Sequence, residues 1–122
     1  MRKLLLLAAF GAAAIGVLVV RSGTAASVPT YNRDVAPILD AKCASCHRIG
    51  GIAPFSLTTA TDAKAHAAGI VRMTRAGLMP PWMPGADSAP IIGRSRRRLT
   101  PGELSTLARW AASGAPTGTP AD

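Results

Sequence analysis

The chain has 122 residues, of which 14 are Lys or Arg and 6 are Asp or Glu, giving a formal net charge of +8 at neutral pH. This length accommodates one domain at most, which excludes a large enzyme and a multi-domain receptor. Its two cysteines are too few for the disulfide framework of a cysteine-stapled toxin.

The N-terminus has the pattern of an export signal. Arg2 and Lys3 precede Leu4–Val20, a run of 17 residues that are all apolar or glycine, and small residues follow at Thr24–Ala26. This order of segments is typical of a signal peptide, so we expect residues 1–26 to be one. The run is close to the length of a spanning helix, so retention as an N-terminal membrane anchor is the alternative. Either outcome predicts a periplasmic domain and argues against nucleic acid as a partner.

The remaining 96 residues have a thin core. Only 24 of their apolar residues are larger than alanine, and their 11 basic and 6 acidic residues give a charge of +5. Small domains of this kind often need a metal or a bound cofactor to complete the core. We expect a short linker at 27–30, one domain at 31–116 and a frayed tail at 117–122.

Apolar periodicity predicts a first helix over 31–44. Thr30 or Asn32 can cap it, and Pro37 is tolerated only near its first turn. A second helix is predicted from about Thr61 to Ala76, with Gly77 as its end.

The clearest local signal is a capping box over Thr100–Glu103, with Pro101 at the first helical position. It predicts a third helix that ends at Ser113–Gly114. No regular element fits 78–93, where four prolines lie, and no alternating strand pattern is visible. The predicted class is therefore all-α, with three or so helices joined by long loops.

The most informative motif is C-x-x-C-H, formed by Cys43, Cys46 and His47. It is the attachment signature of c-type haem. Two thiols one helical turn apart reach the two vinyl groups of one porphyrin, and the adjacent histidine presents a ring nitrogen to the iron. The motif therefore predicts one covalently bound haem c that supplies the missing core.

Three other interpretations of the same residues are open. A structural zinc site would need four ligands, and Cys43, Cys46, His47 and His66 are the only set available. A thioredoxin-like redox motif would need a βαβ context. A simple disulfide would close a loop of only four residues and stabilise little.

The second axial position of such a haem has four candidate ligands. Met79 precedes Pro80 and Pro81, which would hold the loop extended, and it is our first choice. Met83 has a similar setting and is the second choice. Met73 is expected to pack in the core, and His66 is expected to be exposed.

Other residues are candidates for contacts with the haem or with its ligand His47. The carbonyl of Pro54, or of a neighbour within 50–54, is the candidate acceptor for the second ring nitrogen of His47. Trp82 and Trp110 could pack on the porphyrin or donate to a propionate, or they could be ordinary core aromatics. The only charge run is expected to be a solvated loop, with propionate pairing or docking of an acidic partner as the alternative; it comprises Arg94, Arg96, Arg97 and Arg98.

These motifs together resemble a class I c-type cytochrome of the short bacterial type. The resemblance spans nearly the whole mature domain and rests on Tyr31–Leu39, Cys43–His47, Met79–Trp82 and Leu99–Pro116. It implies thioether bonds at Cys43 and Cys46, axial ligation by His47 and Met79, and crossed N- and C-terminal helices. Only 32 positions separate His47 from Met79, which implies a reduced loop over the haem edge.

The expected function is that of a periplasmic one-electron carrier between redox proteins. With both axial positions filled, no iron site is left for a substrate, and the sequence has no Ser/His/Asp set, paired carboxylates or phosphate loop. The partners would be redox proteins with acidic docking surfaces. Two alternatives are open: a redox subunit or tethered donor of one dehydrogenase or monooxygenase, and a haem sensor or enzyme with a labile sixth ligand.

Overall fold

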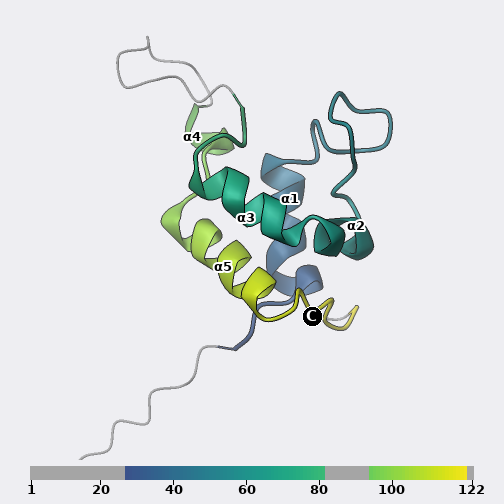
Figure 1. The fold of residues 1–122 in the computed structure, drawn as a ribbon, viewed down its shortest axis with the longest axis vertical. Helices are drawn as coiled ribbons and strands as arrows, with labels where there is room; N and C mark the ends of the chain where they lie inside the picture. Colours follow the sequence, from purple (N-terminus) through teal and green to yellow (C-terminus); the bar gives the residue numbers. More distant parts are fainter. Residues whose placement is uncertain (1–26, 82–93, 121–122) are drawn as a thin grey trace, which may run out of the picture.

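The computed structural model describes residues 27–81 and 94–120, and its elements are all helical (Figure 1). They are η1 (Tyr31–Val35), α1 (Ala36–Lys42), α2 (Ala60–Ala65), α3 (Ala67–Arg75), α4 (Arg94–Arg97) and α5 (Pro101–Ala112). No strand occurs in these two stretches, so the predicted all-α class is confirmed for them. None of the helices described is long and apolar enough to cross a membrane. The expected leader, Trp82 and Met83 lie outside the described residues.

The first predicted helix is present as η1 and α1 together. Thr30 caps it, because its side chain accepts a hydrogen bond from the backbone N–H of Arg33. Pro37 lies in the first turn of α1, where its missing N–H costs least. A π-helical turn over Tyr31–Val35 precedes it. The helix ends at Lys42, two residues earlier than predicted.

The second predicted helix is broken at one residue. His66 ends α2 and begins α3, with φ −107° and ψ 8°, outside the helical region. Its backbone N–H is shared between the carbonyls of Asp62 and Ala63. The helix ends where predicted, since Gly77 has a φ of +69°, a conformation that glycine adopts without strain.

The capping box predicted at the third helix is present. The Thr100 side chain accepts from the Glu103 N–H, and the Glu103 carboxylate accepts from the Thr100 N–H at 2.7 Å. These two bonds satisfy donors that a helix N-terminus otherwise leaves unpaired. They fix the start of α5 at Pro101.

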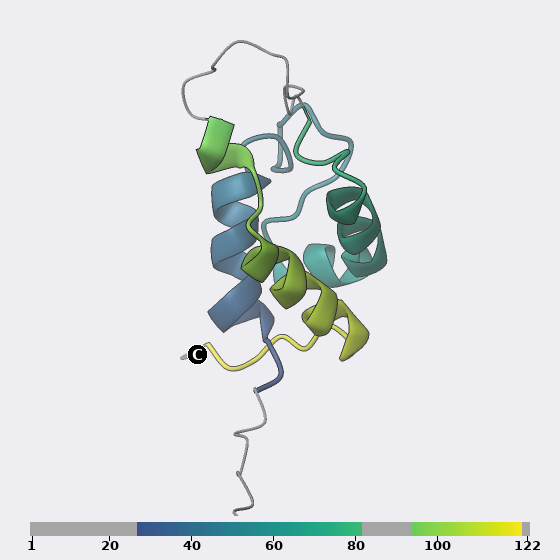
Figure 2. The same cartoon turned by 90° about the vertical axis from the view of Figure 1, so that its left-hand side faces the viewer.

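Helices from both ends of the domain meet around one core. α5 packs on α3 and on η1, and it runs obliquely to η1 and α1 in both views (Figures 1 and 2). Trp110 and Leu107 on α5 are fully buried with Val35 and Leu39 on the first helix. The remaining core residues are Tyr31, Ile38, Leu57, Ala63, Ala67, Ile70, Leu99 and Ala115.

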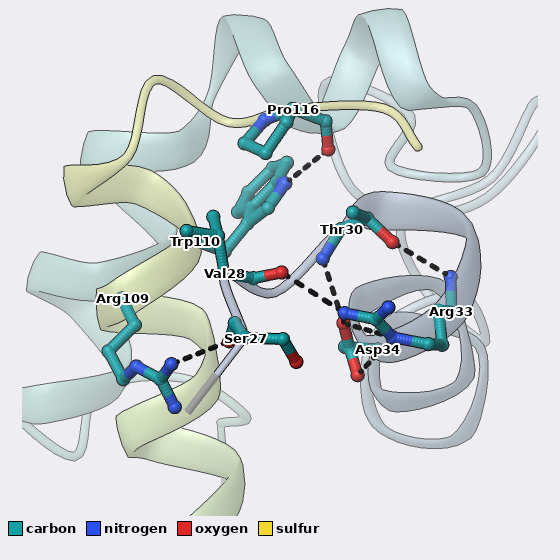
Figure 3. Close-up of polar contacts among 8 residues, drawn as sticks. All are labelled: Ser27, Val28, Thr30, Arg33, Asp34, Arg109, Trp110 and Pro116. Atoms are coloured by element: carbon teal, nitrogen blue, oxygen red, sulfur yellow. Dashed lines mark hydrogen bonds and ion pairs between the residues drawn. The ribbon is translucent and has the colours of Figure 1, made fainter. Parts of the chain in front are cut away.

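The short linker predicted at 27–30 is held to the body of the domain (Figure 3). Arg109 donates to the Ser27 carbonyl at 2.7 Å, and Arg33 donates to the Val28 carbonyl at 3.0 Å. The tail is also ordered to Thr119, whose carbonyl accepts from the Asn32 side chain at 2.9 Å. This differs from the frayed tail we expected, because the tail pairs with the start of η1.

The arginine run contains a short helix, α4, where we expected a loop. The Lys42 ammonium donates to the carbonyls of Arg96 and Arg98, at 2.7 and 3.1 Å. It therefore holds the end of α4 against the end of α1. The side chains of Arg96, Arg97 and Arg98 are exposed.

Candidate functional site

The C-x-x-C-H motif forms a turn directly after α1. The Cys43 N–H continues the helix by donating to Leu39, and the Cys43 carbonyl then accepts from the N–H groups of Cys46 and His47 at 3.1 and 2.9 Å. Both cysteines are free thiols and half-buried. The two thiols and the imidazole therefore come from one compact turn at the end of one helix.

The Cys43 thiol is held protonated. Burial raises its pKa to about 11, with smaller contributions from Cys46 and Glu103. A nucleophilic redox cysteine instead needs a lowered pKa. The βαβ context of a redoxin is also not found, because the described stretches contain no strand. Both observations count against a thioredoxin-like site.

The following loop folds back onto the motif. Ala53 donates to the Cys46 carbonyl at 3.2 Å, and Leu57 donates to the His47 carbonyl at 2.9 Å. Leu57 is buried in the core, so it fixes the far end of the loop. Gly51 lies so close to the Cys46 carbonyl that a Cβ at this position would collide with it. A glycine is therefore required there.

The His47 ring is oriented by the backbone of this loop. Its Nδ1 lies 3.1 Å from the carbonyl oxygen of Phe55. Because a carbonyl only accepts, the contact assigns the proton to Nδ1 and leaves the Nε2 lone pair available for a metal. The predicted acceptor, Pro54 or a neighbour within 50–54, is wrong by one residue. No local sequence signal distinguished Phe55, because the acceptor depends on the path of the loop.

We expected His66 to be exposed, but the structure differs. Its ring is half-buried and stacks on the Phe55 ring, with centroids 4.0 Å apart and planes 4° apart. The Phe55 ring also contacts the His47 ring, with centroids 4.6 Å apart. His66 therefore packs on the residue that orients His47.

The segment that carries Met79 returns toward the same end of the molecule. Leu78 and Met79 both donate to the Met73 carbonyl, at 3.0 and 3.2 Å, and Pro80 is buried. Residues 76–81, the loop after α1 and α4 all lie toward the upper end of the molecule in both views, although in Figure 1 the loop projects to the right while α4 and residues 76–81 lie to the left (Figures 1 and 2). Met79 is half-buried. Met83 is outside the described residues.

The structure also bears on the roles predicted for Met73 and Trp110. Met73 is half-buried and is not part of the core cluster to which we assigned it. Trp110 is an ordinary core aromatic, completely buried, with its indole N–H donating to Pro116 at 3.0 Å.

Large apolar side chains are exposed in the loop that follows the motif. Ile49 and Ile52 are 90% and 86% exposed, and Leu78, which follows α3, is 59% exposed. Phe55, at 37%, belongs to the same loop as the two isoleucines. An exposed apolar cluster of this kind marks a binding surface. The thin core and the exposed cluster both fit a large apolar group at this end of α1.

A zinc centre fits less well. Structural zinc is bound by four protein side chains, but in the part of the chain described, no three His, Cys, Asp or Glu side chains gather closely enough to hold a metal ion. Haem iron needs only one or two protein ligands. The donor set therefore fits a haem better than a structural zinc ion.

Comparisons with protein-family models, with curated proteins and with solved structures found no match for this chain. The case for its function therefore depends on its own residues.

Proposed function

We propose that this protein is an exported monohaem c-type cytochrome of class I, which carries single electrons between redox proteins. The observation that carries the proposal is the turn after α1. It presents two free thiols and an imidazole whose Nδ1 is already bonded to the Phe55 carbonyl. This hydrogen bond is typical of a metal-bound histidine, and it fixes the tautomer and the ring orientation.

The residues of this site have distinct roles in the proposal. Cys43 and Cys46 would hold the haem covalently, and His47 and Met79 would be the axial ligands. When bound, the haem supplies a Fe(III)/Fe(II) couple that takes up and releases one electron. A methionine ligand raises the potential of such a couple. Ile49, Ile52 and Leu78 would shield the site from water.

Arg96, Arg97 and Arg98 support a role for acidic redox proteins as partners. All three are exposed, and Lys42 ties α4 to the helix end that leads into Cys43. Positive charge at this end would steer an acidic partner to the site and speed its association. The carrier role therefore predicts fast, salt-sensitive electron exchange.

Voltammetry and carbon monoxide binding test the carrier role. The exported protein should show one reversible one-electron wave, and the ferrous form should bind carbon monoxide only slowly, because Met79 fills the sixth position. Rapid binding of carbon monoxide in native buffer would instead favour a sensor or enzyme with an open iron site. Stable co-purification with one enzyme would favour the tethered-donor alternative.

A further inference from the structure

His66 is joined to the proposed iron ligand His47 by an unbroken series of contacts. Its Nδ1 lies 2.9 Å from the Asp62 carbonyl, its ring stacks on Phe55, and the Phe55 carbonyl faces His47 Nδ1 at 3.1 Å. The series begins on α2 and ends in the turn after α1. It links a helix junction to the motif.

The position of His66 is fixed from two sides. Its backbone ends α2 and starts α3. Its ring is oriented by the Asp62 carbonyl, which accepts from Nδ1. The imidazole is therefore a fixed, flat surface at the junction of the two helices.

Phe55, in contrast to His66, is not held by a helix. It lies in a loop, its side chain is 37% exposed, and its neighbour Pro54 is exposed. Three contacts set where its carbonyl points. The Leu57 N–H donates to the His47 carbonyl at 2.9 Å, the Phe55 ring stacks on His66, and the same ring contacts the His47 ring, with centroids 4.6 Å apart.

From these contacts we infer that His66 is a positioning residue for the iron ligand His47. By holding the Phe55 ring in place, His66 keeps the Phe55 carbonyl hydrogen-bonded to His47 Nδ1. The inference rests on the proposed function. A hydrogen bond at Nδ1 raises the basicity of a ligating imidazole, and this favours ferric iron. His66 would thereby keep the reduction potential lower than it would be without the stack.

The first test compares His66→Ala with His66→Phe in the purified, haem-loaded protein. The alanine variant removes the stack, whereas phenylalanine retains an aromatic ring for Phe55. We expect His66→Ala to shift the ferric-to-ferrous ratio at fixed ambient potential toward ferrous by roughly threefold to tenfold. This equals a rise in potential of about 30 to 60 mV, at about 59 mV per decade. His66→Phe should restore most of the change.

The second test asks whether His66 acts through Phe55. Phe55→Leu retains the backbone carbonyl but removes the ring that stacks on His66 and also contacts the His47 ring. It should raise the potential by at least as much as His66→Ala, and the double variant should show no rise beyond that of Phe55→Leu alone. Additive effects would show that His66 acts by another route, and this would overturn the inference. Lys64→Ala is the matched control, because Lys64 is exposed on α2, and it should leave the potential unchanged.

Proton exchange gives a readout independent of the potential. The His47 Nδ1–H resonance of the ferrous protein should exchange with solvent at least about tenfold faster in His66→Ala than in the wild type. His66→Phe should lie close to the wild type. If the protein carries haem and His66→Ala changes neither exchange nor potential, the inference is wrong while the proposed function stands. A chain without haem contradicts both.

Discussion

The indole N–H of Trp110 donates to the carbonyl of Pro116 at 3.0 Å, and the same oxygen accepts from the backbone N–H of Tyr31 at 2.9 Å. One carbonyl therefore joins the last helix to the start of the first. Gly114 and Ala115 make this return possible, with φ values of +83° and +53°. The fully buried Trp110 thus both fills the core and closes the two ends of the domain.

Trp110→Phe should lower the free energy of unfolding by about 1 to 3 kcal/mol. The change removes part of a buried ring and one hydrogen bond. Pro116 remains paired with Tyr31, so the loss should stay at the lower end of that range. Urea denaturation followed by circular dichroism measures it. An unchanged midpoint would show that the indole contributes nothing beyond a phenyl ring.

Thr100→Ala should cost about 1 kcal/mol of stability, because it removes the side chain that caps α5. Ser105→Ala is the matched control: Ser105 is exposed in the middle of the same helix, where alanine has the higher helix propensity. The control should be neutral or slightly stabilising. Equal losses in both variants would contradict the assigned role of the capping box.

Asp34→Asn should flatten the acid limb of the stability curve. A hydrogen bond from Arg33 lowers the pKa of the Asp34 carboxyl, with a further contribution from the Thr30 N–H. Because the pKa of the Asp34 carboxyl is lower in the folded than in the unfolded protein, its charge stabilises the fold at pH values above the unfolded-state pKa of about 4. This stabilisation is lost as the pH falls through the folded-state pKa. The pair is solvent-accessible, so the effect should be under about 1 kcal/mol.

Denaturant titrations at a series of pH values test this expectation. The gap in stability between wild type and Asp34→Asn should be constant near neutral pH and should close on acidification below about pH 4. A gap that persists unchanged in acid would show that the carboxylate charge is not involved.

Met79→Ala should abolish the long-wavelength charge-transfer band of methionine-ligated ferric haem. Met73→Ala is the control, since Met73 is also half-buried and lies at the end of α3, beside the same segment. It should retain the band. Loss of the band in Met83→Ala together with its survival in Met79→Ala would transfer the ligand assignment to Met83.

Local signals in the sequence predicted the start of α5 and the end of α3. The Thr100 capping box and the left-handed Gly77 depend only on residues within one turn, so they could be identified without the fold. The break at His66 could not, because apolar periodicity continues across it. The Phe55 acceptor was missed by one residue for a related reason: its position depends on how the loop returns to the motif. The hydrogen bonds from Lys42 to the carbonyls of Arg96 and Arg98 join residues more than fifty positions apart. No local sequence pattern indicates such a contact.

The mass of the exported protein, recorded with its absorption spectrum, tests the central claim most directly. The account predicts the mass of the chain plus one covalently bound haem, a c-type spectrum, and no reaction of Cys43 or Cys46 with an alkylating reagent after denaturation. A mass without haem, together with two alkylated thiols, would contradict it.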